Sequence, residues 1–600
     1  MFKFFLSLSK VSFLLIVTFF SACSQITSKE KATPVSIDKE VVNEQEVNKS
    51  IEDEKKYQPS NMTAEMMYKV LLAEMLVKKQ QPSAAFNILY PLAVETRDAK
   101  LAERVFNLSM QTLDEQAISA STNLWLDISP KESLPWMSAY LLDLRAGNVE
   151  GAYLKWQNYI ALSTTSLERK LVETSLRVSK SVSKRYGLAF LKKIEMAYPD
   201  NLAAIFAVGS AAESYLEYTL AITKLKKSID LYDSMGDRHS EYMLGIKKEN
   251  YYLLANSYFN LGRYKEGIAK IEPQVVKEPN NWRLQDALAR LEVRAGYLLK
   301  AKMRYQAIVD GEASFSKSRL SLALLQLDNQ EFGEAIDNLQ ILKRDRRYFP
   351  VATYYLGVSE LRRKNNEKAV LYFSQVSLKS NYYLDAQLNL LEINFQSKGL
   401  DKTIQQLKQL TPRTIKDKLK IHRASAFFYQ RSQKKHQAIE EYQLALEVSP
   451  KNIEILLLQA YVLYDVKEFD WYERNLLAIL EVDSNYVDAL NALGYYYVEH
   501  VIKLEQAAIL LETANRLNPN SFYIIDSLGW LAYQKEEYHK SEKLLEKAFD
   551  LEKDVEVFLH LIKVKVKLNK KDEAIELGKK YQGQFKRNKS LNSLLKKLEN

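Results

Sequence analysis

The side chains that most often carry catalysis or bind metals are sparse in this chain of 600 residues. Cys23 is the only cysteine, so no second thiol is available for a disulfide or a thiolate zinc site. No pair of histidines has the His-Glu-x-x-His spacing, and no Gly-x-Ser-x-Gly, P-loop or Gly-x-Gly-x-x-Gly motif occurs. We therefore expect no enzyme activity, metal, cofactor or small-molecule substrate. The six histidines are His239, His422, His436, His500, His539 and His560.

Cys23 lies where a covalent modification is expected. Lys3 and Lys10 give a positive start, residues 11–20 are almost entirely apolar, and Ser21 and Ala22 are small. This pattern is typical of a secretory signal peptide, and it is too short to span a membrane as a mature helix.

The four residues ending at Cys23 resemble the lipobox of bacterial lipoproteins, with Phe20 where Leu is usual. The resemblance implies that residues 1–22 are removed and that Cys23 becomes the acylated N-terminus, carrying palmitate or a related chain. Since Ser24 follows and not Asp, it also implies an outer-membrane lipoprotein with its body in the periplasm. The alternative is an ordinary signal peptide with an incidental cysteine. Residues 23–60 form the lipidated start and a linker too polar to order itself, without an aromatic residue before Tyr57.

Small residues recur along the rest of the chain with a period of 34 residues, and a second series follows 12 residues behind the first. A fixed period of 34 is typical of the tetratricopeptide repeat, in which two short helices cross so closely that only a small side chain fits between them. The first series is Ala255, Ala289, Ala323 and Gly357, then Ala426, Ala460, Gly494 and, 35 residues later, Gly529. The second is Gly267, Ala301, Ala335, Ala369, Ala438, Ala507 and Ser541.

The copy that begins at Val487 resembles the tetratricopeptide pattern W-x-x-L-G-x-x-Y most closely, with Leu490 in place of Trp. The pattern predicts an all-α protein, an α-solenoid of stacked helix–turn–helix repeats. The same register predicts repeats that start near residues 66, 100, 134, 168 and 202, with Asn107, Leu141 and Ser175 at the tight position of degenerate copies. Ten more start near 248, 282, 316, 350, 384, 419, 453, 487, 522 and 556.

The 34-residue spacing is interrupted once, by about a dozen additional residues around 231–242. We therefore expect two stacks, a degenerate one over 61–235 and a regular one over 243–600, with a loop at 233–237 between them. The final 40 residues carry twelve Lys or Arg and four Asp or Glu, which makes a basic cap. This charge is either an electrostatic docking surface or simply the polar outer face that a terminal repeat needs.

The first helices of such repeats usually line a groove, and positions 2, 5, 9, 12 and 13 of each repeat usually face it. Aromatic and amide side chains at these positions suit an extended peptide or a partner helix, because aromatic rings supply contact area and polar groups bond to backbone. The alternative is that tyrosine, present 37 times, mostly packs repeat against repeat. The predicted partner-binding residues are Tyr252, Asn256, Tyr495, Tyr523, Asp526, Trp530 and Tyr533.

Two segments extend the family resemblance. Residues 525–530 and the stretch from Thr96 to Arg104, with Trp125 and Pro130 after it, resemble proteobacterial outer-membrane tetratricopeptide lipoproteins. One such group consists of adaptors that present cell-wall hydrolases to a carboxyl-terminal processing protease, a serine protease of the periplasm. The resemblance implies a protein-binding scaffold of this kind, attached to the membrane by its lipid, with no nucleic-acid partner. The alternative is a structural component of pilus, exopolysaccharide or outer-membrane protein assembly; an enzyme is the third hypothesis.

Overall fold

The structure, a computed structural model, describes residues 63–112, 114–236, 240–585 and 588–599. Within these ranges it contains helices and turns but no strand, so the predicted all-α class is confirmed. Among the described residues no helix combines the length and the apolar character that crossing a membrane requires. Cys23, the signal peptide and the whole predicted linker lie outside the described residues.

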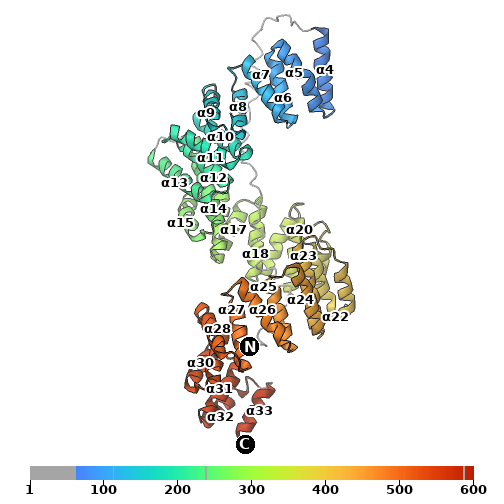
Figure 1. Cartoon of the computed structure of the whole chain (residues 1–600), viewed down its shortest axis with the longest axis vertical. Coiled ribbons are helices and arrows are strands. Elements are labelled where there is room, and N and C mark those ends of the chain that lie inside the picture. Colours follow the sequence, from blue (N-terminus) through green and yellow to red (C-terminus); the bar gives the residue numbers. More distant parts are fainter. Residues whose placement is uncertain (1–62, 113, 237–239, 586–587, 600) are drawn as a thin grey trace. The chain divides into compact units, whose positions relative to one another are not determined.

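The chain divides into two compact units between Gln326 and Leu327 (Figure 1). The N-terminal unit contains α4 (Ala64–Lys78), α5 (Pro82–Thr96), α6 (Ala99–Thr112), α7 (Glu115–Ile128), α8 (Ser133–Arg145), α9 (Val149–Ala161), α10 (Leu167–Ser181), α11 (Lys184–Ala197), α12 (Leu202–Ser214), α13 (Tyr218–Ser234), α14 (Glu241–Asn260), α15 (Tyr264–Lys277), α16 (Trp282–Arg294), α17 (Leu298–Gly311) and most of α18 (Ser316–Asp328). The predicted stack boundaries at 235 and 243 stay predictions.

The C-terminal unit continues in the same manner. It contains α19 (Phe332–Lys343), α20 (Phe349–Arg362), α21 (Asn366–Ser374), α22 (Tyr383–Gln409), α23 (Ile415–Arg431), α24 (Lys435–Val448), α25 (Ile453–Asp465), α26 (Phe469–Val482), α27 (Val487–Glu499), α28 (Leu504–Leu517), α29 (Phe522–Gln534), α30 (Tyr538–Leu551), α31 (Val555–Lys567), α32 (Lys571–Gln582) and α33 (Lys589–Glu599).

The helices pack as repeating pairs. Most helices contact the next one along the chain, and first helices of successive pairs also contact each other, as α12 with α14 and α27 with α29 do. A helix begins within a few residues of every predicted repeat start; the largest difference is at α14, which begins at 241 where 248 was expected. α22 contains both helices of its repeat, separated by a kink at Gly399, where φ is 74°.

Most of the additional residues at 231–242 lie in two long helices. The prediction of a loop at 233–237 is therefore wrong for its first two residues. Asp233 and Ser234 belong to the 17-residue helix α13, and the next helix, α14, has 20 residues. The extra turns are held by buried apolar side chains, Tyr232 at the end of α13 and Ile246 in α14. Lys247 ties the two ends together, because its ammonium group lies 2.6 Å from the carboxylate of Asp233.

The small residues sit where the helices of a pair cross. A Cβ atom added to Gly494 would lie 2.7 Å from Cγ of Leu511, closer than side chains normally approach. Asn107, predicted at this position in the second repeat, is exposed and the prediction is wrong there. The contact is made two residues later, where the hydroxyls of Ser109 and Ser121 are 2.7 Å apart and buried. A hydrogen-bonded serine pair thus replaces the glycine–leucine contact.

Candidate functional site

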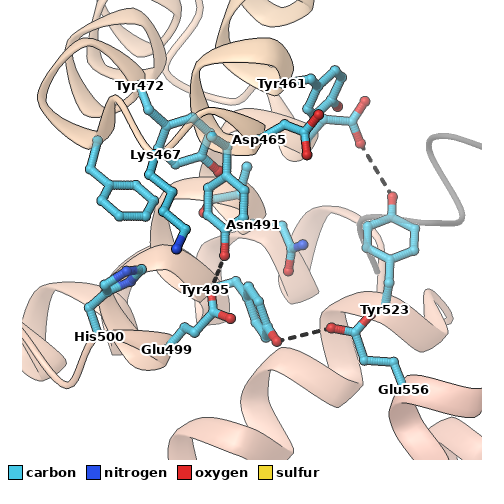
Figure 2. A pocket seen from close by; sticks show the side chains of 14 residues that line it. Tyr461, Asp465, Lys467, Tyr472, Asn491, Tyr495, Glu499, His500, Tyr523 and Glu556 are labelled. Atoms are coloured by element: carbon cyan, nitrogen blue, oxygen red, sulfur yellow. Dashed lines mark hydrogen bonds between the residues drawn. The ribbon is translucent and has the colours of Figure 1, made fainter. Parts of the chain in front are cut away.

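A cavity of about 470 Å³ opens among the first helices of the C-terminal unit, α25, α27, α29 and α31 (Figure 2). We call it the tyrosine cavity because five tyrosines line it. The second helix α26 closes it on one side. The lining residues are Tyr461, Tyr464, Asp465, Lys467, Phe469, Tyr472, Asp488, Asn491, Ala492, Tyr495, Glu499, His500, Tyr523 and Glu556.

Two of the predicted partner-binding residues line this cavity. The hydroxyl of Tyr495 donates to a carboxylate oxygen of Glu556 at 3.2 Å, and that of Tyr523 donates to Asp488 at 3.4 Å. The Tyr523 bond joins α29 to the neighbouring first helix α27, and the Tyr495 bond joins α27 to α31, the second first helix after it (Figure 2). The two rings are thereby held in fixed positions at the cavity wall.

Three other predicted residues are absent from the cavity lining and lie on α29, near His560 of α31 or the ring of Trp530. Asp526 is buried and lies 2.9 Å from Nδ1 of His560. The ring of Trp530 is stacked between those of Tyr533, at 4.4 Å, and His560, at 4.2 Å. Asp526 and Trp530 therefore contact the next repeat through His560, the alternative that the sequence left open, whereas Tyr533 packs on Trp530 of its own helix. Their role in binding stays a prediction.

The last two predicted residues, Tyr252 and Asn256, lie on α14 in the N-terminal unit. The guanidinium of Arg283 covers the ring of Tyr252 at 3.5 Å and also pairs with Glu249 at 2.5 Å. Arg290 donates to the side-chain oxygen of Asn256 at 2.9 Å. Arginines of α16 therefore hold both residues, and both belong to a different compact unit from the tyrosine cavity.

Burial also perturbs a carboxyl group on this N-terminal surface. Glu213 of α12 is partly desolvated and faces the negative charge of Glu249, and these two effects raise its pKa to about 6. A carboxyl with a raised pKa is costly to keep ionised at neutral pH. Glu213 and Glu249 thus place two carboxyl groups close together on neighbouring first helices of this unit.

Sequence reasoning missed several members of the tyrosine cavity. Tyr461, Tyr464 and Asp465 occupy positions 9, 12 and 13 of the repeat that starts at residue 453, which are groove positions. The rule used for the neighbouring repeats would therefore have found them. Phe469 and Tyr472 come from the second helix α26, where the groove rule gives no signal.

Carboxylates dominate the electrostatics of the cavity. Burial raises the pKa of Asp488 above its ordinary value, although the hydrogen bond from Tyr523 partly opposes this effect. Burial, aided by the hydrogen bond to Glu499 and its charge, raises the pKa of Tyr464 far above the ordinary value, so this phenol stays a neutral donor. The arrangement can bind or orient a charged group, but within the described residues no cluster of side chains could hold a metal ion.

The basic cap is partly neutralised within the fold. Lys565 is buried and its ammonium group lies 2.7 Å from Glu542, 3.1 Å from Glu546 and 3.2 Å from Glu573. Lys570 also pairs with Glu542, at 2.7 Å. These two lysines therefore hold α30, α31 and α32 together. Whether the basic cap is a docking surface or a polar outer face stays a prediction.

Comparisons with known proteins agree with the paired helices. A tetratricopeptide repeat family model matches residues 320–398. A tetratricopeptide repeat-containing protein of Pseudomonas aeruginosa, PA4667, is 24% identical over 210 residues, which are 35% of this chain and 35% of that protein. The match thus spans about a third of the relative's length.

Two solved structures are among the matches. A thermophilic tetratricopeptide repeat protein of Thermus thermophilus is 19% identical, with a TM-score of 0.27 over 31% of this chain and 98% of the other. The Cut9–Hcn1 hetero-tetramer of the APC/C is 13% identical, with a TM-score of 0.30 over 74% of this chain and 91% of the other. The family model thus identifies tetratricopeptide repeats at residues 320–398, and the same paired arrangement of helices continues on both sides of this segment.

Proposed function

We propose that this chain is a protein-binding scaffold, anchored to the outer membrane through Cys23, that presents cell-wall hydrolases to a carboxyl-terminal processing protease in the periplasm. The observation that carries the binding role is the tyrosine cavity. It lies on the first helices of tetratricopeptide repeats, the surface with which such repeats bind partners, and it offers rings beside hydrogen-bonding groups.

The rest of the chain supports the scaffold role. Stacked repeats present long continuous surfaces, and two compact units offer two such surfaces on one polypeptide. Binding a protease and its substrate to one chain raises their effective concentration toward each other without any chemistry by the scaffold. The membrane anchor rests on the signal-like segment and on Cys23.

Co-purification from envelopes tests this function. We expect the tagged chain, isolated from detergent-solubilised membranes of its own bacterium after mild crosslinking, to bring down a serine protease and cell-wall hydrolases. Recovery of neither, in cells that make both, would refute the adaptor role. A stoichiometric complex with integral membrane proteins would instead favour the envelope-assembly alternative.

The anchor has its own test in the variant Cys23→Ala. We expect radioactive palmitate to label the parent chain and not the variant, and the variant to leave the membrane fraction, since no other thiol can replace Cys23. Equal labelling of both chains would contradict lipidation at this residue.

A further inference from the structure

The tyrosine cavity has a chemical character that favours one kind of occupant. Its volume of about 470 Å³ is within the range of sites that hold one or a few side chains. Its wall is aromatic on several sides, with ring centroids of Tyr464 and Tyr472 5.1 Å apart and those of Tyr464 and Phe469 5.6 Å apart. These rings pack against one another and therefore form a wall that needs little reordering to bind a ligand.

Three carboxylates stand in this wall with tyrosine hydroxyls as hydrogen-bond donors. Asp488 accepts from Tyr523, Glu556 from Tyr495, and Glu499 from Tyr464. A phenol donor orients a carboxylate but leaves its negative charge in place, so charge and geometry are both fixed in the absence of a partner.

Basic side chains are few among the lining residues. The fourth lining carboxylate, Asp465, pairs with Lys435 at 2.6 Å, and Lys467 is the lysine that lines the cavity. Lys563 of α31 lies close enough to Glu499 to interact with its charge. Acidic groups therefore outnumber basic ones among the lining residues.

The lining also contains a histidine, His500. Its Nδ1 lies 3.0 Å from the carbonyl oxygen of Tyr496, and its ring packs on Phe469 at 4.7 Å. The imidazole is thus engaged with α27 and α26.

A cation suits such a wall in two ways. Aromatic faces attract positive charge through their quadrupole, most strongly where water is excluded, and carboxylates bind it directly. A guanidinium does both at once, because its plane stacks on rings while its five N–H groups donate to carboxylate oxygens in a fixed fork. An acidic side chain or a carboxyl terminus would face repulsion.

We propose that the tyrosine cavity binds an arginine side chain presented by a partner protein, with the guanidinium stacked on the tyrosine rings and hydrogen-bonded to Glu499 and Glu556. This inference rests on the protein-binding part of the proposed function and assigns a recognition chemistry to it. The C-terminal unit would then select positively charged segments of a partner, whereas a site that binds carboxylates selects negatively charged ones.

A pair of short peptides tests the proposal. The probes are acetyl-Ala-Arg-Ala-amide and the same peptide with citrulline, which has the shape of arginine without its charge. Binding to the full-length chain is measured by ligand-observed NMR. We expect the arginine peptide to bind at least about tenfold more tightly, since a charge in contact with carboxylates and rings is lost in citrulline.

Substitutions in the chain test whether the arginine peptide binds in the tyrosine cavity. We expect Glu499→Gln combined with Glu556→Gln to lower the affinity for the arginine peptide by about tenfold or more. The affinity for the citrulline peptide should stay unchanged. Glu481→Gln, an exposed position on α26 outside the cavity, is the matched control and should behave as the parent chain does. Circular dichroism of each variant checks that the helices are intact.

Equal binding of the two peptides, or an undiminished affinity in the double variant, would overturn the proposal. Co-purification of the protease by the same double variant as efficiently as by the parent would also overturn it, while leaving the scaffold role standing. Failure of the parent chain to capture any protein would refute the scaffold role independently of the peptide result.

Discussion

Replacing Lys565 with methionine will destabilise the C-terminal repeats by about 2–4 kcal/mol. The side chains of Lys565 and Glu542 are each 9% exposed, and the same ammonium group also contacts Glu546 and Glu573. Methionine preserves most of the stem but leaves three carboxylates near one another, one of them buried. Lys570 still pairs with Glu542, which keeps the loss below that of an isolated buried charge. Urea unfolding followed by circular dichroism measures the change.

The control is Lys567→Met, on an exposed position of the same helix. Its free energy of unfolding should stay within about 0.5 kcal/mol of the parent value. Equal effects of the two substitutions would show that the cluster around Lys565 contributes no stability beyond an ordinary surface charge.

The same cluster should make the C-terminal repeats sensitive to acid. Burial acts to raise the pKa of Glu542, but hydrogen bonds and charges from Lys565 and Lys570 outweigh it and hold the pKa below its ordinary value of 4.5. A lowered folded-state pKa contributes stability that is present above 4.5 and is lost as the pH falls through the folded value. Lys565→Met should therefore reduce the dependence of stability on pH below about 4.5.

A single methyl group at Gly357 will destabilise the protein by about 1–3 kcal/mol, although alanine normally favours a helix over glycine. The added Cβ would lie 2.6 Å from Cε1 and 2.7 Å from Cδ1 of Phe373. Phe373 is fully buried, so its rigid ring cannot turn aside without displacing α21 from α20. The shift in the midpoint of urea unfolding of Gly357→Ala, relative to the parent chain, measures this loss of stability.

Gly333→Ala is the matched control in the neighbouring helix α19. No atom lies within 4 Å of a Cβ added at Gly333, and its φ is not in the left-handed region. Alanine should leave stability unchanged there or raise it by up to about 1 kcal/mol. Effects of the same sign and size at both glycines would contradict the close crossing that the 34-residue spacing implies.

The sequence predicts the repeat architecture well because close helix crossings impose a strict requirement on side-chain size. Gly494 and Gly357 can be recognised from spacing alone, since the chain must bring two backbones together at each of them. Ser109 and Ser121 meet the same requirement with a hydrogen bond, which the pattern of glycine and alanine does not reveal. The prediction for Asn107 is wrong for this reason.

The candidate site was predicted less completely. Tyr495 and Tyr523 follow from their position in the repeat, whereas the stacking of Trp530 between Tyr533 and His560 depends on rings that approach from two helices. Phe469 enters the cavity from a second helix, where the repeat rule predicts no groove residue. Position in a repeat thus identifies the face of a helix, but neighbouring side chains decide which residues on that face are accessible.

Site-specific photocrosslinking in the living bacterium tests the central claim most directly, namely that the tyrosine cavity is where this scaffold binds protein. Benzoyl-phenylalanine is placed at Tyr495 or Tyr523 in the cavity, and at exposed Leu477 or Ile509 on the second helices as controls. The account predicts crosslinks to a partner protein from the two cavity positions and none from the controls. Crosslinks from the control positions alone would contradict it.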